Sequence, residues 1–552
     1  MVSGPRPSGS DAVDLLVVGG LTIDRFADGS TAPGGSVLHA ARALHLDGRR
    51  TAIATLAGDE PPARAGIAEL GEIADVRVQA ADRTITFEHR EVGGRRELTF
   101  GGSAGTLDLR QLPQAPRAVL YASIADELDA ALGGQAYAGV ATGPILQGWL
   151  RDLRPGEPVD QRALAALDGR LLDALAGCNL LVASVDDLAR EATSPDAQLA
   201  ALRGAFGPRP IVALTAGLDG AWLSLPGGEV RRLMVTHRVE GVSTVGAGDA
   251  FAAAMLAALS RGDAPVDAAQ DAANLVAELL AERTDRQLYV TGDVHGMLGE
   301  LRAALRLAGL IDASGSWAGG RDELWLTGDL ADRGPDGIGV IELVMRLQRE
   351  APAAGGRVGC VLGNHEVQLL AAHDMPGAST SGFGGTFEAN WEANGGRATD
   401  LARLNDEQVA WLRTLPVAAR IGPALVVHSD SARYPELGRS IAAANAAVAA
   451  LLAKPRPAAW DGLLADLAER RAFARDPAAA ARLLAAWGGH EVVHGHTPVT
   501  RLFDDAPGHP PGSEPGGAVR YAAGRAVAVD GGVYAGGDVI LHRVPRYDAI
   551  RA

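Results

Sequence analysis

Short apolar runs alternate with Ala/Leu-rich helical stretches along most of the chain. DLLVVGG (14–20), TAIATLAG (51–58) and RPIVALTAG (209–217) have the length and the β-branched content of buried strands. AGDAFAAAMLAALSRG (247–262) and AAQDAANLVAELLAER (268–283) are typical of closely packed helices. A regular succession of strands and helices favours an α/β fold with a largely parallel sheet.

Three segments depart from this alternation. TITFEHREVGGRRELTF (84–100) alternates polar and apolar residues about a Gly-Gly turn, which predicts a β-hairpin. The Pro/Gly-rich stretch DDAPGHPPGSEPGGAV (504–519) predicts a surface loop. The polar residues 1–13 predict a disordered tail.

The type of motif changes near residue 285. A chain of 552 residues is too long for one ordinary core, so at least two domains are expected. TDRQ (284–287) has the character of a short linker, and a new apolar strand starts at Leu288. We predict one α/β domain over 14–284 and a second over 288–545.

Charge and composition exclude some classes of function. The formal net charge of −16 disfavours nonspecific binding to nucleic acid or to anionic membranes, which carry the same sign. The sequence contains no run of about 18 uncharged apolar residues, so no membrane-spanning helix is predicted. The polar N-terminal stretch has no apolar core of a secretion signal. Cys178 and Cys360 lie far apart in apolar runs and are interpreted as core residues. These features indicate a cytoplasmic protein without a nucleic-acid or membrane partner.

Five short motifs rich in acidic and histidine residues follow one another in the second half. They are GDVHG (292–296), GDLADRG (328–334), GNHE (363–366), VVHS (426–429) and HGHTP (494–498). Each follows an apolar strand, and the carboxyl ends of parallel strands meet where α/β proteins bind ligands. The motifs therefore bring together Asp293, His295, Asp329, Asn364, His365, His428 and His496.

This set of side chains suits metal-dependent phosphate chemistry. Carboxylate, imidazole and amide ligands together favour divalent Mn, Fe, Zn or Co. If Asp329 bridges two such ions, they would lower the pKa of a shared water and stabilise both oxygens of an in-line displacement. Arg333 offers a bidentate fork to a phosphate group. His365 is placed to protonate the leaving oxygen, with Asp332 as its orienting partner.

Residues 288–545 resemble the calcineurin-like metallophosphoesterases. Within that superfamily they are similar to the phosphoprotein phosphatase and bis(nucleosyl)-tetraphosphatase branch, whose signature is GDxHG, GDxxDRG and GNHE. NGGRATD (394–400) and VDGGVYAGGDVI (529–540) also resemble this branch. The resemblance implies an αββα sandwich and two bound metals. It assigns Asp293 and His295 to the first metal, Asp329 to both, and Asn364, His428 and His496 to the second.

Three details of this resemblance remain open. His428-Ser429-Asp430 stands where eukaryotic members have His-Gly-Gly or His-Ala-Gly. The family uses a second phosphate-binding arginine, for which Arg475 is a candidate, and His494 is interpreted as a supporting residue rather than a ligand. The substrate is a phosphoprotein, a dinucleoside polyphosphate or a small phosphate monoester.

The first half carries a second phosphate-handling pattern. TVGAGDAF (244–251) opens a helix, where the N–H groups of Gly246, Ala247 and Gly248 would form an anion hole. Asp249 follows and is placed to act as general base on a substrate hydroxyl. The three further motifs that complete the pattern are VVGGLTIDR (17–25), with Asp24 just after a strand, PGGS (33–36) and LTAGLDGAW (214–222).

These motifs resemble the PfkB/ribokinase family of sugar and nucleoside kinases over about 14–283. The resemblance implies a ribokinase-like αβα sandwich, Mg-ATP as the phosphate donor, and commonly a homodimer formed through the lid. GPILQGWLR (143–151) is similar to a subgroup with inositol-kinase-like members, and the hairpin at 84–100 would belong to the lid or core. Asp24, Gly34 and Gly35 would contact substrate hydroxyls, Asp249 would be the base, Gly246 and Gly248 would hold the transferred phosphate, and Thr215, Gly217 and Asn274 would lie near the nucleotide.

Several residues depart from the kinase pattern. Ser243 replaces the first Asp of DTxGAGD, Ser184 and Asp187 replace the Asn and Glu of NxxE, and His39 replaces a common Asn. Two hypotheses therefore stay open. The chain is a bifunctional kinase and phosphatase, or its first half is a ligand-binding module that regulates or scaffolds the phosphatase.

Overall fold

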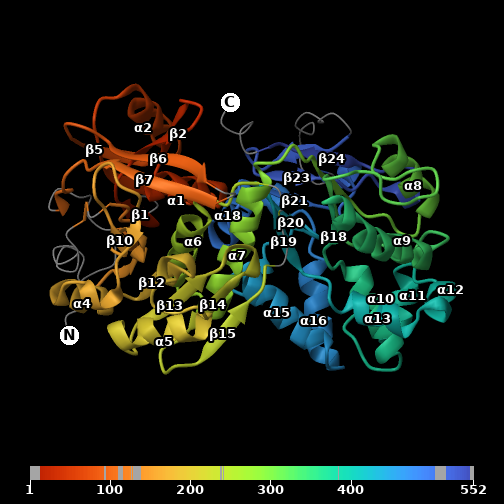
Figure 1. Ribbon diagram of the computed structural model, residues 1–552. Helices are drawn as coiled ribbons and strands as arrows, with labels where there is room; N and C mark the ends of the chain where they lie inside the picture. The colour runs from red at the N-terminus through yellow and green to blue at the C-terminus, as the bar shows by residue number, and fades with distance from the viewer. Residues whose placement is uncertain are drawn as a thin grey trace. The chain divides into compact units, whose positions relative to one another are not determined.

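The computed structural model describes residues 13–92, 95–109, 116–125, 127–128, 139–235, 239, 242–382, 385–503 and 517–546. The chain divides into two compact units between Leu280 and Ala281, and each unit is described by itself (Figure 1). Nearly all of the tail predicted for 1–13 and most of the loop predicted for 504–519 lie outside the described residues.

The first unit is built on a mostly parallel sheet. One side of the sheet consists of five parallel strands. Their order across the sheet is β5 (Asp75–Ala80), β4 (Thr51–Ala57), β1 (Leu15–Val18), β8 (Ala118–Tyr121) and β9 (Ala141–Pro144). A parallel bridge from Ile145 to Val182 connects them to a second group of strands. That group has the order β12 (Leu180–Ser184), β13 (Ile211–Thr215), β14 (Ala221–Ser224) and β15 (Val230–Leu233), with β12 and β13 parallel.

Helices cover both faces of this sheet, as the two-residue alternation of its strands requires. Leu16 and Val18 of β1 share a core with α4 (Gly169–Ala176) and α5 (Pro195–Phe206). The opposite face packs against α1 (Ser36–Leu46) and α6 (Ala247–Arg261), which contact each other. The unit also contains α2 (Pro61–Ile73) and α7 (Pro265–Ala281). The predicted αβα architecture is confirmed.

A separate four-stranded sheet forms the lid of this unit. Its order is β3 (Thr31–Gly34), β2 (Thr22–Phe26), β6 (Ile85–Val92) and β7 (Arg95–Gly102). β6 and β7 pair antiparallel, so the predicted hairpin is confirmed. Asp24 lies inside β2, whereas the sequence placed it just after a strand. Gly19, the residue after β1, passes so close to the carbonyl of Ala122 that a Cβ would clash, and the chain then enters a strand of the other sheet.

The second unit contains two sheets packed face to face. One has the order β18 (Arg357–Cys360), β17 (Glu323–Leu326), β16 (Leu288–Thr291) and β24 (Leu541–Val544). The other has the order β19 (Ala418–Ile421), β20 (Ala424–Val427), β21 (Glu491–His494), β23 (Ala526–Ala528) and β22 (Val519–Tyr521). Val290 and Trp325 of the first sheet share an apolar core with Val426, Val493 and Val527 of the second. This sheet-on-sheet core lies between two helical layers, so the predicted αββα sandwich is confirmed.

The helices of the second unit enclose a larger core against the outer faces of the sheets. They are α8 (Leu298–Leu307), α9 (Gly337–Glu350), α10 (Asn364–Asp374), α11 (Phe387–Ala393), α12 (Ala398–Arg403), α13 (Asp406–Leu412), α14 (Tyr434–Leu437), α15 (Ile441–Leu452), α16 (Pro457–Leu467), α17 (Ala472–Arg475) and α18 (Pro477–Trp487).

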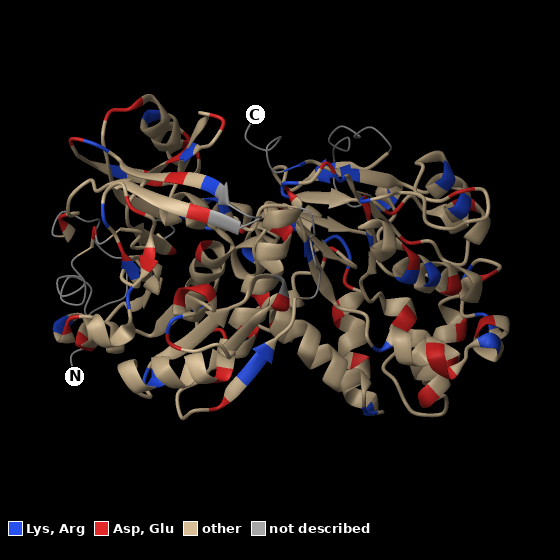
Figure 2. Cartoon of the chain, viewed as in Figure 1, with Lys and Arg blue, Asp and Glu red and all other residues tan. Residues whose placement is uncertain are grey.

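Cys178 and Cys360 are buried and form no disulfide, as predicted. Within the described chain, no helix combines the length and the apolar character that crossing a membrane requires. Acidic and basic positions are interspersed over both units (Figure 2).

Candidate metal centre and substrate cavity

Five strand ends of the second unit converge on one buried centre. β16, β17 and β18 are neighbours in one sheet, and β20 and β21 are neighbours in the other. The residues just beyond these strands are all buried: Asp293, His295, Asp329, Asn364, His365, His428 and His496. The strand ends therefore bring together all seven side chains that the motifs singled out.

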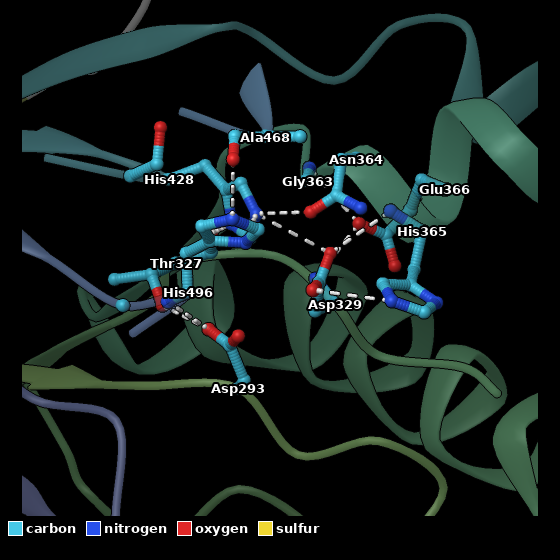
Figure 3. Close-up of polar contacts among 12 residues, drawn as sticks. Asp293, Thr327, Asp329, Gly363, Asn364, His365, Glu366, His428, Ala468 and His496 are labelled. Atoms are coloured by element: carbon cyan, nitrogen blue, oxygen red, sulfur yellow. Dashed lines mark hydrogen bonds and ion pairs between the residues drawn. The ribbon is translucent and has the colours of Figure 1, made fainter. Parts of the chain in front are cut away.

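These side chains form two groups that share one carboxylate (Figure 3). Asp293, Asp329, His428 and His496 offer ligand atoms within 4.8 Å of one another, and so do His295, Asp329 and His365. The Oδ1 atom of Asp329 lies 3.5 Å from Nε2 of His428, and its Oδ2 atom lies 3.6 Å from Nε2 of His295. One oxygen of Asp329 thus faces each group, which is the arrangement a carboxylate bridging two cations requires.

Asp293 provides a test of whether the centre suits a cation. Its Oδ1 atom accepts hydrogen bonds from the His496 amide at 2.9 Å and from the Thr327 hydroxyl at 3.3 Å. Its Oδ2 atom is buried without a hydrogen-bond partner and lies 3.9 Å from Nε2 of His295. A buried oxygen of this kind is unfavourable unless a cation or donor satisfies it. Asp293 thus belongs to the group of His428 and His496, and its Oδ2 atom also faces His295, the side to which the resemblance assigned it.

The imidazoles are oriented by backbone carbonyls behind them. Nδ1 of His295 lies 3.0 Å from the Ala331 carbonyl, and Nδ1 of His428 lies 2.7 Å from the Thr327 carbonyl. His496 uses its other nitrogen, since Nε2 lies 3.1 Å from the Ala468 carbonyl. A carbonyl accepts only a proton-bearing nitrogen, so the opposite nitrogen of each ring presents its lone pair to the centre.

Protonation states in the centre also suit metal ligands. Burial lowers the pKa of His428, and burial together with a neighbouring histidine lowers the pKa of His295 and His496 well below its ordinary value. Burial alone would raise the pKa of Asp329, but four surrounding histidines outweigh it and hold that pKa well below its usual range. Neutral imidazoles around an ionised carboxylate are the forms that bind divalent metals.

Backbone strain is concentrated in this centre. In the part of the chain that the structure describes, eight non-glycine residues have a left-handed φ, and five of them lie here: His295, Asp329, Asp332, Arg333 and His496. Such conformations cost on the order of 1–3 kcal/mol each and persist only where other contacts enforce them. Glu366 supplies such contacts, because its buried carboxylate accepts the amides of Asp329, Leu330 and Gly363 at 2.7–2.9 Å.

His365 lies beside the shared carboxylate of Asp329 and is hydrogen-bonded to Asp332. Its Nδ1 atom lies 2.7 Å from Oδ2 of Asp332, and its Nε2 atom lies 3.9 Å from Oδ2 of Asp329. Burial opposes its charge, but these two carboxylates raise its pKa above the ordinary value. The indole N–H of the buried Trp391 donates to the other oxygen of Asp332 at 2.8 Å. Trp391 was not identified from sequence, although it lies just before the NGG motif.

The NGGRATD stretch positions Arg333. The Arg333 amide donates to the Gly395 carbonyl at 2.8 Å, and Gly395 has a φ of 99°. A Cβ at Gly395 would lie 2.8 Å from Cγ of Arg333, so glycine leaves room for that side chain. The guanidinium lies 4.5 Å from the centre of the Tyr534 ring and contacts Nε2 of His295 at 2.7 Å and of His365 at 3.0 Å. Arg333 therefore presents its charge to the group formed by His295, Asp329 and His365.

Two arginines of the segment after α16, Arg470 and Arg475, differ in their exposure. Arg475 is exposed at the end of α17, whereas Arg470 is half-buried. Burial is the main cause that lowers the pKa of His428 and His496, and nearby positive charges, including that of Arg470, lower it further. Arg470 also lies two residues after Ala468, whose carbonyl contacts Nε2 of His496 at 3.1 Å, and it is therefore a second candidate for the phosphate-binding position besides Arg475.

His494 has the supporting role expected from the sequence. Its Nδ1 atom lies 3.0 Å from the Gly495 carbonyl and its Nε2 atom lies 2.6 Å from the Tyr521 hydroxyl. Both ring nitrogens therefore have partners outside the two groups, and neither is directed to a metal position.

A cavity of about 340 Å³ lies in the first unit, between the central sheet and the lid. Asp24 and Gly35 line one part of it, and Asp249 lines another. The other predicted residues that line it are Thr215, Gly217, Gly246, Ala247 and Gly248. The open space that connects Asp24 with Asp249 is what a kinase needs to bring an alcohol to its base.

The cavity floor begins at the amino end of α6. Gly246 caps this helix with a φ of 82°, and His39 packs so closely against it that a Cβ would clash. The helix N-terminus directs its amides and its positive dipole end toward the cavity. Burial raises the pKa of Asp249 to about 6, while Ser36 and Arg151 act in the opposite direction. A carboxyl with this pKa is a better proton acceptor than an ordinary aspartate.

Two predicted residues lie outside the cavity lining. Asn274 is in α7, where its side chain accepts from Gln270 at 3.2 Å. Gly34 ends β3 and leaves no room for a Cβ beside the Asp24 carboxylate. The departures Ser184 and Asp187 do line the cavity, and they bind each other through the Ser184 amide at 2.8 Å and the Asp187 amide at 3.1 Å. Arg151 also lines it, although the sequence had not identified it as a site residue.

Comparison with known families gives one match for each half. Residues 158–289 match the pfkB family carbohydrate kinases, and residues 287–508 match the calcineurin-like phosphoesterases. The chain therefore joins a pfkB carbohydrate kinase region to a calcineurin-like phosphoesterase region, as the motifs of the two halves predicted.

Individual relatives cover only parts of the chain. Shewanella-like protein phosphatase 2 of Arabidopsis thaliana is 39% identical over 89 residues, which are 16% of this chain and 22% of that protein. A symmetrical bis(5'-nucleosyl)-tetraphosphatase of Pectobacterium carotovorum subsp. carotovorum (strain PC1) is 38% identical over 131 residues, 23% of this chain and 37% of that protein. The chain thus spans well under half the length of these curated relatives.

One similar solved structure is a pyrophosphate-dependent kinase in the ribokinase family complexed with a pyrophosphate analog and myo-inositol. It is 18% identical, and the match covers 48% of this chain and 94% of that chain with a TM-score of 0.41.

Proposed function

We propose that the second unit, over 288–545, hydrolyses phosphate esters with two divalent metals. The observation that carries the proposal is the pair of ligand groups that share Asp329. The chemistry that two metals supply in such a centre is Lewis acidity toward the phosphoryl oxygens and a lowered pKa of the attacking water. One group would be formed by His295 and Asp329, the other by Asp293, Asp329, Asn364, His428 and His496, and Oδ2 of Asp293 also faces His295.

The chain's own residues supply the remaining steps. Arg333 and Arg470 bind the non-bridging oxygens of the phosphoryl group from the two sides of the centre. His365 gives its proton to the leaving oxygen, and Asp332 holds the imidazole at 2.7 Å in the orientation that this transfer needs. The substrate class is a small phosphate monoester, a phosphoprotein or a dinucleoside polyphosphate, the last two in keeping with the named relatives.

Metal removal tests this function. The full chain is stripped with a chelator, reloaded with Mn²⁺, Fe²⁺, Zn²⁺ or Co²⁺, and assayed on p-nitrophenyl phosphate, phosphopeptides and diadenosine tetraphosphate. We expect hydrolysis to disappear on stripping and to return with at least one of these ions. Undiminished hydrolysis by the stripped chain would contradict the two-metal proposal. The relative rates on the three substrates identify the substrate class.

Trp391 should support the proton donor through Asp332. Trp391→Phe keeps the buried ring and removes the N–H that donates to Asp332, so we expect kcat on p-nitrophenyl phosphate to fall roughly tenfold with KM unchanged. Trp411→Phe is the matched control, because its indole also donates to a side chain, Gln348, at 2.8 Å but lies on α13. Equal effects of the two substitutions would rule out a specific role for Trp391.

For the first unit, over 14–284, we propose transfer of a phosphoryl group from Mg-ATP to a hydroxyl of a sugar, nucleoside or inositol. The cavity that contains both Asp24 and Asp249 supports this function. A ligand-binding module that regulates the phosphatase is the alternative, favoured by the departures Ser184 and Ser243. ATP-dependent phosphorylation across a panel of these alcohols separates the two, since a binding module would retain ligand affinity without turnover.

A further inference from the structure

Asp430 stands where the second unit departs from the branch it resembles. It is fully buried, and its carboxylate accepts three hydrogen bonds. Oδ1 accepts from the Arg471 amide at 2.9 Å and the Thr497 hydroxyl at 3.4 Å, and Oδ2 accepts from the Tyr521 hydroxyl at 3.3 Å. Burying a carboxylate is unfavourable unless donors surround it, so this environment is built around Asp430.

The residues after Asp430 also contact the segment that contains Arg471, residues 466–471. The Ser431 hydroxyl and the Ala432 amide donate to Oε2 of Glu469 at 2.7 and 2.8 Å. The Arg433 guanidinium pairs with Asp466 at 3.0 Å. We call these contacts, together with the bond from Arg471 to Asp430, the 430–433 clamp. It fixes residues 466–471 against the loop that begins with the metal ligand His428.

The clamped segment contributes to the centre at two points. The Ala468 carbonyl orients His496 through a 3.1 Å contact with Nε2. Arg470 lies two residues further on, so the contact between Ala468 and His496 brings its backbone close to this group. Arg471 comes next with a left-handed φ of 62°, a strained conformation for a residue with a side chain. Its amide is the group that donates to Asp430.

We propose that Asp430 is a positioning residue for phosphate binding. By accepting the Arg471 amide, it fixes the left-handed turn that places Arg470 beside the group of His428 and His496. The phosphoryl group of the ester is the ligand that Arg470 then binds. This inference rests on the proposed phosphatase function, and it makes Asp430 a determinant of phosphate affinity rather than a neutral replacement for glycine.

Inorganic phosphate binding tests the inference without turnover. The Mn²⁺-loaded full chain is titrated with phosphate by calorimetry, and KM and kcat are measured in parallel on p-nitrophenyl phosphate. Asp430→Ala should weaken phosphate binding and raise KM by about tenfold, because it releases the turn that holds a charged hydrogen-bond donor. Asp430→Asn keeps an oxygen for the Arg471 amide and should stay within about threefold of the unmodified chain.

A double substitution distinguishes positioning from general damage. Because Asp430 acts through Arg470, Asp430→Ala combined with Arg470→Ala should bind phosphate no more weakly than Arg470→Ala alone. Additive losses, or a tenfold loss that persists in Asp430→Asn, would overturn the proposal. A large fall in Mn²⁺ affinity in Asp430→Ala would also overturn it, since the residue would then serve the metals and not Arg470.

Two further variants keep the test decisive. If Asp430→Ala does not fold, Glu469→Ala removes the acceptor of the Ser431 hydroxyl and the Ala432 amide at a half-buried position and should raise the phosphate Kd in the same direction. Asp476→Asn is the control, because Asp476 pairs with Arg482 at the exposed start of α18 and should leave binding unchanged. An unaltered phosphate Kd in Glu469→Ala would count against the clamp. A chain that binds phosphate but hydrolyses no ester would refute the proposed function while these binding comparisons still decide the role of Asp430.

Discussion

Asp329→Asn should abolish hydrolysis of p-nitrophenyl phosphate, with a loss of at least about 10³-fold, or about 4 kcal/mol of transition-state stabilisation. Asp329 is the one side chain common to both ligand groups. An amide in its place offers one oxygen and no charge, so it cannot balance two divalent cations. The fold should survive, because Oδ1 can still accept the His365 amide, a contact of 3.0 Å.

The loss should be accompanied by a change in metal content. Atomic absorption on the reloaded chain is expected to find two metals per unmodified chain and fewer in Asp329→Asn. Asp249→Asn, a substitution of the same chemistry in the first unit, is the matched control and should leave both metal content and hydrolysis intact. Retained full activity in Asp329→Asn would contradict a bridging role, and an inactive variant with two metals would point to a different cause of the loss.

The residues of the buried centre could be predicted from sequence because each lies within a few residues of a strand end. A strand fixes where its last residue is, and a short glycine-containing turn leaves little freedom for the residues immediately after it. The motif after β16 therefore places Asp293 and His295, and the motif after β17 places Asp329. The alternation of apolar runs and helical stretches predicted an α/β fold with a largely parallel sheet, whereas the two sandwich architectures were predicted from the family resemblances.

The supporting residues could not be predicted in this way, because their roles depend on contacts between distant segments. Arg470 and Arg475 lie five positions apart in one arginine-rich stretch, and nothing local distinguishes them. Arg470 is half-buried and directly precedes the left-handed turn at Arg471, whose amide donates to Asp430 of another loop, whereas Arg475 is exposed. Trp391 likewise reaches Asp332 only through the packing of α11.

Asp24 illustrates a different limit. Its motif was identified in the sequence, which placed Asp24 just after a strand. In the structure Asp24 lies within β2 of the lid. Gly19 and Gly20 separate β1 from β2, but in the sequence this Gly-Gly pair is equally compatible with an ordinary turn after a strand. The structure shows that Gly19 passes so close to the carbonyl of Ala122 that a larger residue would clash there. Asp24 reaches the cavity from the lid side, opposite the amino end of α6.

Asp249→Asn should reduce ATP-dependent phosphorylation of the alcohol substrate by about 10²- to 10⁴-fold, the usual contribution of a general base. An amide cannot accept the hydroxyl proton, while its similar shape should keep the cavity and the affinity for the alcohol. Asp329→Asn serves as the reciprocal control, since it should abolish hydrolysis and leave phosphorylation intact. Unchanged turnover in Asp249→Asn would remove the base from the mechanism.

The pH dependence gives an independent view of the same residue. Because burial raises the pKa of Asp249 to about 6, the carboxyl is protonated and inactive as a base below that pH. kcat/KM for phosphorylation should therefore fall about tenfold per pH unit on the acid side of pH 6 and level off above it. Asp187 raises the pKa of Asp249 by charge repulsion, so Asp187→Asn should move this acid limb to lower pH whatever its effect on the maximal rate. A limb that stays in place in Asp187→Asn, or that lies near the ordinary pKa of an aspartate, would mean that Asp249 is not the group whose ionisation controls transfer.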